Sequence, residues 1–188
     1  MKNSYVRLGG ILFLIAAISA GVLAFLNDST KDLIAKNEAM AATSPEVLES
    51  VMPGSVMFND YADAALVETI KSENGKFVNL QTAVDASNNE LGYVVRTFST
   101  VAGYGGDMEL FVGISPEGKI TGVNVVSHSE TSGLGSRTTE PSFTSQFVGK
   151  DATAEITDFD AITGATKSSK SFLSAVNNAI SIYDQYLK

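Results

Sequence analysis

The sequence predicts an α+β domain, an antiparallel sheet with packed helices, preceded by one N-terminal transmembrane helix. Three observations support this prediction: an uncharged apolar run near the start, a central series of segments rich in Val, Ile, Phe and Thr, and a final segment with apolar residues at helical intervals. The chain has 188 residues, 44% of them apolar and 18% charged. This is enough for one packed domain and an anchor.

The first element is the apolar segment 8–26, which contains no charged residue. As a helix it would be about 28 Å long, close to the thickness of the hydrocarbon core of a bilayer. The alternative is a cleaved signal peptide, with small residues such as Ala20 near the cleavage site. The apolar run is longer than the roughly 7–15 residues of a signal-peptide core, which favours an uncleaved anchor.

Flanking charges predict the orientation of this anchor. Lys2 and Arg7 precede the span, and all 21 acidic residues follow it. By the positive-inside rule, residues 1–7 are cytoplasmic and residues 27–188 lie outside the cell membrane. In a bacterium this is the outer face of the inner or cytoplasmic membrane.

Residues 27–56 are expected to form connecting helices between the anchor and the globular domain at 57–188. Residues 28–30, Asp-Ser-Thr, offer caps for a helix that runs to about Ala42. Ser44 then caps a second short helix with Pro45 at its first position, and Pro53 with the glycine after it ends that helix.

The middle of the chain predicts strands, separated by turn residues. The expected strands are residues 76–84, 90–98, 108–115 and 119–128. The turn at 116–118, Pro-Glu-Gly, makes the last two an antiparallel hairpin.

The last third predicts a loop and two helices. A polar loop follows His128, and Pro141 opens a short helix with Phe143 and Phe147 on one side. From 167 to 187, apolar residues recur at intervals of three and four, which indicates an amphipathic helix with one face on the sheet.

Composition excludes several classes of function. The formal charge of −8 argues against a nucleic-acid binder. The chain has no cysteine and one histidine, which excludes disulfides, thiolate metal sites and multi-histidine metal sites. Redox chemistry in this chain would therefore need an organic cofactor.

The segment 160–169, DAITGATKSS, is a hydroxyl-rich turn that opens the last helix. Free N–H groups and the positive dipole end of a helix suit an anion such as phosphate, and Lys167 would add a compensating charge. The alternative is ordinary helix capping by Thr163, Thr166 or Ser168. The residues alone leave both open.

The string DAITGATKSS also resembles the attachment motif of the covalent FMN-binding domain family, which is Asp, two residues, then Ser/Thr-Gly-Ala-Thr. In that family a flavin transferase joins FMN to the last threonine of the motif through a phosphoester bond. The resemblance places that bond at Thr166, with Asp160 and residues 163–165 matching the rest of the motif.

Two further segments resemble the same family, in the same order. Residues 101–114, VAGYGGDMELFVGI, resemble its glycine-tyrosine-glycine turn and following strand, and residues 128–135, HSETSGLG, resemble its His-x-Glu-Thr-x-Gly-Leu-Gly loop. Ser132 stands where the family usually has proline. The resemblance covers roughly residues 30–188, behind a single N-terminal span in the expected place.

The resemblance implies a set of flavin-contacting residues around Thr166. Tyr104 would stack on the ring, and the glycine-rich loop would contact the ring, ribityl chain or phosphate. The expected contacts are Tyr104, Glu130, Thr131, Gly133, Leu134, Gly135, Thr163, Gly164, Ala165, Lys167 and Ser168.

The resemblance also implies a function. The chain is similar in particular to the G component of Rnf-type ion-translocating complexes, which pass electrons between ferredoxin and NAD. It would relay electrons through FMN between other membrane and peripheral subunits, after modification by a flavin transferase. The alternatives are the C component of the sodium-pumping NADH:quinone reductase, which is usually longer, and a non-redox membrane-anchored binding module.

Overall fold

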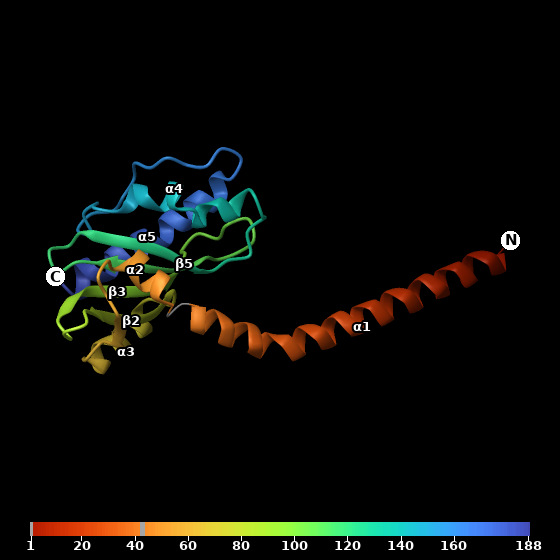
Figure 1. Ribbon diagram of the computed structural model, residues 1–188. Helices are drawn as coiled ribbons and strands as arrows, with labels where there is room; N and C mark the ends of the chain where they lie inside the picture. The colour runs from red at the N-terminus through yellow and green to blue at the C-terminus, as the bar shows by residue number, and fades with distance from the viewer. Residues whose placement is uncertain (1, 42–43) are drawn as a thin grey trace. The chain divides into compact units, whose positions relative to one another are not determined.

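The computed structural model describes residues 2–41 and 44–188, which form two units. One is the helix α1 (Lys2–Ala41), and the other is a compact domain formed by residues 44–188 (Figure 1). Within α1, the stretch Tyr5–Lys31 is long and apolar enough to cross a membrane, and its side chains are exposed. The apolar segment 8–26 lies inside that stretch.

The helix α1 is continuous through residues 28–30, where we expected the cap of a new helix. Thr30 Oγ1 donates a hydrogen bond to the carbonyl of Leu26 at 2.8 Å. A threonine makes this bond to the preceding turn inside a helix, not as its N-cap. The predicted helix start was therefore wrong, and its predicted end at Ala42 lies outside the described residues.

Five strands form one antiparallel sheet in the order β1-β2-β3-β4-β5, so each strand pairs with its neighbours in the sequence. The strands are β1 (Met57–Asp60), β2 (Phe77–Val84), β3 (Glu90–Phe98), β4 (Glu109–Ile114) and β5 (Ile120–Ser127). The four predicted strands are confirmed to within one residue at each end, and β4 and β5 form the predicted hairpin.

The turn between β2 and β3 is organised by one carboxylate. Asp85 Oδ1 accepts hydrogen bonds from the backbone N–H groups of Ser87 at 2.8 Å and Asn89 at 2.9 Å. The side-chain amide of Asn89 donates to Oδ2 at 2.9 Å. These bonds, led by the one from the Asn89 amide, hold the pKa of Asp85 below its ordinary value.

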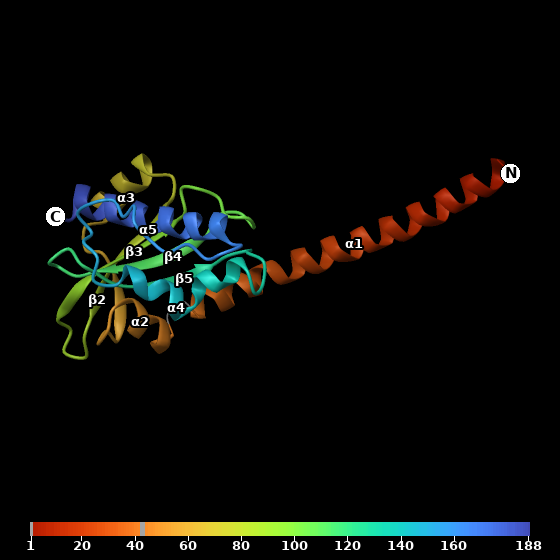
Figure 2. The same cartoon turned by 90° about the horizontal axis from the view of Figure 1, so that it is seen from above.

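The helix α5 (Thr166–Tyr186) lies along one face of the sheet, as the spacing of its apolar residues predicts (Figure 2). Its fully buried side chains include Phe172 and Val176, which pack with residues of β4 such as Leu110. The short helix α4 (Pro141–Thr144) and the 3₁₀ turn η2 (Ser145–Phe147) add two phenylalanines to this core, as predicted. The Phe143 and Phe172 rings meet edge to face, 5.2 Å apart.

The helix α2 (Pro45–Val51) packs on the opposite face of the sheet (Figure 2). Ser44 caps it and Pro45 begins it, as predicted. A glycine of β5, Gly122, allows the close approach, because a Cβ there would collide with the carbonyl of Ser50. Thr121 Oγ1 donates to the Val51 carbonyl at 2.7 Å, so the end of α2 is bonded to the sheet.

Two elements, β1 and the helix α3 (Ala64–Glu73), were not predicted from the sequence. The strand β1 is a four-residue edge strand with half-buried or exposed side chains. The side chain of Asp63 caps α3 through the N–H of Leu66 at 3.0 Å, and only two of the helix's side chains are buried. The strand β1 adds an edge to the sheet at the end opposite β5. The helix α3 adds its two buried side chains to the core on the α5 side of the sheet.

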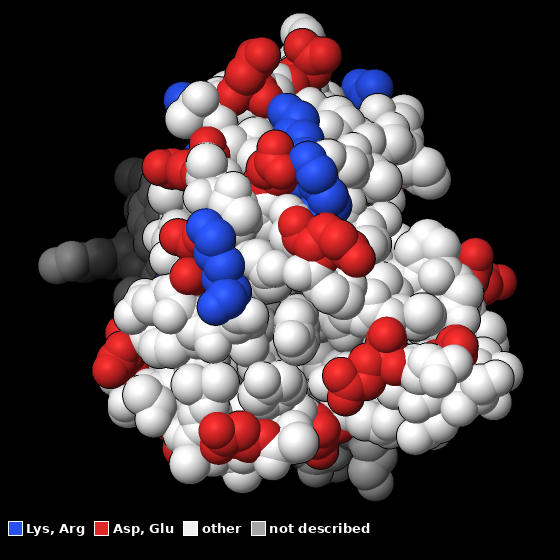
Figure 3. All heavy atoms as spheres, turned by 90° about the vertical axis from the view of Figure 1, so that its left-hand side faces the viewer, with Lys and Arg blue, Asp and Glu red and all other residues white. Residues whose placement is uncertain are grey.

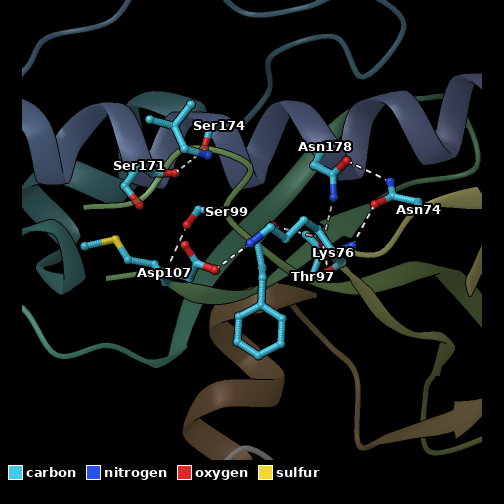
Figure 4. A network of polar contacts seen from close by, with 11 residues as sticks. Asn74, Lys76, Thr97, Ser99, Asp107, Ser171, Ser174 and Asn178 are labelled. Carbon is cyan, nitrogen blue, oxygen red and sulfur yellow. Dashed lines mark hydrogen bonds and ion pairs between the residues drawn. The ribbon is translucent and has the colours of Figure 1, made fainter. Parts of the chain in front are cut away.

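A buried polar network ties α5 to the sheet (Figure 4). The side chain of Asn178 on α5 donates to Thr97 Oγ1 on β3 at 2.6 Å and accepts from the Asn74 amide at 2.8 Å. Thr97 Oγ1 in turn donates to the Lys76 carbonyl at 3.0 Å. Because each buried polar group has a partner, the network fixes the position of α5 along the sheet.

The surface shown in Figure 3 mixes acidic and basic side chains. Acidic groups are spread over this face, and the lysines and arginines between them form no continuous basic patch. This distribution agrees with the net charge of −8.

Candidate functional site

A pocket of about 370 Å³ lies at the N-terminal end of α5. Three segments form its walls: the glycine loop after β3, the loop after β5, and the first turn of α5 with the residues before it. All of its lining residues belong to the set expected from the sequence: Tyr104, Glu130, Thr131, Leu134, Gly135, Gly164, Ala165, Lys167 and Ser168. The structure thus brings together segments separated by up to about 60 residues of chain.

The turn before α5 is held by local hydrogen bonds. The N–H of Ala165 donates to the Ile162 carbonyl at 2.9 Å, and Gly164 has a φ of 82°, which favours glycine at that position. Ser169, which is fully buried, accepts from the N–H of Ile162 and donates to the carbonyl of Ala165, both at 3.0 Å. One serine therefore closes the turn from inside the helix.

None of the hydroxyls expected as alternatives caps α5. The N-cap residue is Ala165, and no side chain makes a capping bond there. Thr166 is the first residue of the helix, and its side chain is exposed, as is that of Thr163. Within the described residues, the N–H groups of residues 166–168 have no hydrogen-bond partner, which leaves the positive end of the helix dipole available to an anion.

Glu130 is the one buried carboxylate of the pocket, with 8% of its surface exposed. Its Oε2 accepts a hydrogen bond from the Ser168 hydroxyl at 2.6 Å, and its Oε1 accepts from the N–H of Gly105 at 3.1 Å. Both oxygens are thus bonded to the protein, one to α5 and one to the glycine loop.

Glycines surround this carboxylate. A Cβ at Gly103 would collide with Glu130 Oε1. A Cβ at Gly135 would collide with Glu130 Oε2 and would lie 2.6 Å from Ser168 Oγ. A Cβ at Gly105 would meet the carbonyl of Ser129. Glycine is therefore required at position 105, where the obstacle is backbone, whereas a Cβ at position 103 or 135 would displace the Glu130 side chain.

The other predicted residues lie at the mouth of the pocket or beside it. Tyr104 is 78% exposed and Leu134 is 49% exposed, so both present apolar surface to solvent. Thr131 is exposed, and its carbonyl accepts from the N–H of Leu134 at 3.1 Å. Gly133, Thr163 and Thr166 lie next to lining residues in the chain but do not line the pocket themselves.

His128 directly follows strand β5. Its Nδ1 accepts a hydrogen bond from the N–H of Glu130 at 3.1 Å. The imidazole thereby sets the backbone direction just before the buried carboxylate.

Sequence reasoning missed Gln146. Its side-chain amide accepts from the N–H of Asp160 at 2.7 Å and donates to the carbonyls of Phe143 at 2.9 Å and Asp160 at 3.3 Å. A second pocket of about 240 Å³ lies here, with Arg137 and Asp160 among its lining residues. No local pattern marks Gln146, because the contact that holds the turn is with the backbone of Asp160, 14 residues away.

The sequence profile of the FMN-binding domain family matches residues 103–181, which include all the residues that line the 370 Å³ pocket. The profile of the RnfG N-terminal region matches residues 1–44. The RnfG N-terminal match covers the helical unit, and the FMN-binding match lies within the domain.

Whole-chain relatives carry related names. The G component of the Na(+)-translocating ferredoxin:NAD(+) oxidoreductase complex of Acetobacterium woodii is 34% identical over 97% of this chain and 93% of its own length. The G component of the ion-translocating oxidoreductase complex of Shewanella baltica is 29% identical over 96% of this chain and 90% of its own length.

A solved structure shares the fold. The crystal structure of the C component of the Na(+)-translocating NADH-quinone reductase from Parabacteroides distasonis covers 65% of this chain and 67% of its own, with a TM-score of 0.51 and 21% identity. At this identity the likeness concerns the fold alone.

Proposed function

This chain belongs to the RnfG family, the G components of ion-translocating oxidoreductase complexes, and on that premise we propose that it relays electrons between other subunits of such a complex through bound FMN. One observation carries the proposal: the FMN-binding family match covers all the residues that line the pocket at the start of α5. The FMN-binding match favours a flavin carrier over a binding module without a redox cofactor. Similarity over nearly the whole length of the RnfG relatives favours this assignment over the C component of the NADH:quinone reductase.

The residues present fit a flavin nucleotide. A pocket of about 370 Å³ is within the range of small-molecule sites. The free N–H groups at the start of α5 and the Lys167 ammonium suit a phosphate, and the exposed Tyr104 and Leu134 suit an aromatic ring. The glycines of the walls let the backbone approach a flat ligand closely.

We propose that Thr166 Oγ1 forms the phosphoester bond to FMN. The hydroxyl is exposed at the first position of α5, where a second enzyme can reach it, and no capping bond occupies it. In the transfer, Thr166 Oγ1 would bond to the phosphorus of the FMN half of a flavin dinucleotide, the pyrophosphate bond would break to release a nucleoside monophosphate, and the hydroxyl proton would leave to a base on the transferase. Ser169 and Gln146 hold the turn that presents Thr166.

The protein's role in electron transfer is positional. FMN, when bound, supplies the one- and two-electron chemistry that this chain's side chains lack. The pocket walls orient the ring, and the tether at Thr166 keeps the cofactor from dissociating. The donor and acceptor of electrons would be neighbouring subunits, and the names of the relatives point to ferredoxin and NAD as substrates of the whole complex.

The helix α1 is proposed as the single membrane anchor, with the domain on the outer side. Its apolar stretch is long enough to span the bilayer, and Lys2 and Arg7 precede that stretch or lie at its start. On that side of the membrane a lost cofactor could not be replaced from the cytoplasmic pool, so a covalent tether is chemically sensible.

The test is Thr166→Val in the full-length chain, expressed with a flavin transferase. Valine keeps the β-branched shape and removes the one oxygen that the phosphoester needs. We expect wild type to show a fluorescent band near 20 kDa on a denaturing gel and an FMN adduct on the peptide that contains Thr166, since the chain mass is 19.8 kDa. Thr166→Val should show neither.

The matched control is Thr163→Val, an exposed threonine in the same turn that should keep its flavin. An adduct on Thr163 or Ser168 in Thr166→Val would refute the attachment site. Absence of any FMN from wild type, bound or covalent, would refute the proposed function itself.

A further inference from the structure

The carboxylate of Glu130 joins the three segments that wall the pocket. One oxygen accepts from the Ser168 hydroxyl on the first turn of α5, and the other accepts from the N–H of Gly105 in the glycine loop. Glu130 itself belongs to the third segment, the loop after β5. No other side chain in the described residues is hydrogen-bonded to both of the other walls.

The approach around this carboxylate is unusually close. Cβ atoms at Gly103 and Gly135 would overlap its oxygens, so the segments on either side are built to contact it. The group is nevertheless a charge with only 8% of its surface exposed, and no lysine or arginine in the described residues pairs with it. Such a burial is retained only where hydrogen bonds compensate for lost hydration.

We propose that Glu130 is a positioning residue that latches the glycine loop to α5 and thereby holds the flavin ring in its pocket. The inference rests on the proposed function and deepens it. With both oxygens bonded to the protein, Glu130 acts on the ring through the walls it joins. Loss of the latch lets the glycine loop and α5 separate, and the tethered ring becomes accessible to solvent.

The structure offers a matched set of variants. Ser168→Ala removes one arm of the latch and keeps the Glu130 charge. Glu130→Ala removes both arms, and Glu130→Gln keeps both, because its oxygen accepts from Gly105 and its amide donates to Ser168. Ser171→Ala is the control: Ser171 is fully buried one turn farther along α5, and its hydroxyl has no partner in the described residues (Figure 4).

The measurement is iodide quenching of the fluorescence of covalently attached FMN, in full-length detergent-solubilised protein at constant ionic strength. Ser168→Ala and Glu130→Ala should raise the quenching constant by about threefold or more, the change in a local opening equilibrium that one hydrogen bond produces. Glu130→Gln and Ser171→Ala should stay near the wild-type value. Because Ser168→Ala keeps the negative charge, its change is not electrostatic attraction of iodide.

The outcomes separate the two proposals. If Ser168→Ala carries stoichiometric FMN, unfolds at the wild-type temperature and shows wild-type quenching, the latch is refuted. The same holds if Glu130→Gln opens the site as widely as Glu130→Ala. If Glu130→Ala does not fold, Ser168→Ala decides the question, since it removes a single oxygen. Wild type without FMN would instead refute the proposed function.

Discussion

Ser169 and Ser171 are both fully buried on α5, and only Ser169 has hydrogen-bond partners for its hydroxyl. The pair separates two roles that composition does not distinguish. Ser169 closes the turn that presents Thr166, whereas Ser171 buries an unpaired hydroxyl. In sequence they are two small polar residues on one amphipathic helix, and only the turn geometry tells them apart.

We therefore predict different effects on the free energy of unfolding for two alanine substitutions. Ser169→Ala should lower the free energy of unfolding by about 1–3 kcal/mol, because the N–H of Ile162 loses its acceptor. Ser171→Ala should leave it unchanged or raise it, because an unpaired buried hydroxyl is removed. Urea unfolding of the two variants measures this difference. Equal destabilisation by both would contradict the assigned roles.

The candidate site was largely predictable at the residue scale because its motifs are local in sequence. All the lining residues of the pocket lie in the three segments that the sequence singled out. The hydrogen-bond partners within the site could not be predicted from the sequence. Glu130 was expected as a flavin contact, and its partners Ser168 and Gly105 follow only from the fold.

At the scale of elements, the sheet was predictable and its accessories were not. Strands β2 to β5 carry the β-branched and aromatic residues that mark buried strands, whereas β1 is a short edge. The helix α3 buries Val67 and Ile70 only, so its apolar face is weak, though Asp63 was a usable cap signal. The continuity of α1 was missed because Asp, Ser and Thr favour caps but are also tolerated inside a helix.

The contact between α2 and the sheet depends on Gly122. Gly122→Ala should lower the free energy of unfolding by about 1–3 kcal/mol, because the new methyl group would overlap the Ser50 carbonyl and displace the end of α2. Gly75→Ala is the control, since a Cβ there has open space and the free energy should change by less than about 1 kcal/mol. Thermal unfolding of both variants is the measurement. A neutral Gly122→Ala would mean that α2 is not held this closely.

The β2–β3 turn should make stability depend on pH in acid. The pKa of Asp85 is lowered in the folded state by hydrogen bonds from Asn89 and Ser87, so its contribution is present above the unfolded-state pKa. It is lost as the pH falls through the lower folded-state pKa. The difference in urea midpoint between wild type and Asp85→Ala should be present at neutral pH and shrink in acid. A difference that persists after protonation would contradict this account.

At the scale of the whole molecule, the chain is one long helix, the proposed anchor, followed by one domain that contains both described hydrophobic cores. Helix α2 lies before residue 57, the expected start of the globular domain. It nevertheless packs on the sheet and contributes Val51 to a core. The uncharged apolar run and the pattern of the strands are both visible in the sequence, and together they predict this division into helix and domain. The packing of α2 depends on glycines in distant strands, which the sequence does not reveal.

Topology is the prediction that belongs to this scale. We expect protease added to intact spheroplasts to remove the domain, because the positive charges of Lys2 and Arg7 favour a cytoplasmic N-terminus. Exchanging both for glutamate should reduce the fraction of chains in this orientation. Full protection of the wild-type domain would contradict the orientation, and lysed spheroplasts serve as the control for protease access.

The turn that carries Thr166 has a consequence for the order of biogenesis. It is held by Gln146 from the η2 turn and by Ser169 from α5, so an unfolded chain does not present the threonine in this shape. A transferase that recognises the shape would ignore nascent or misfolded chains. Export and folding would then come first and cofactor loading last, so that the presence of flavin marks the protein as ready for assembly.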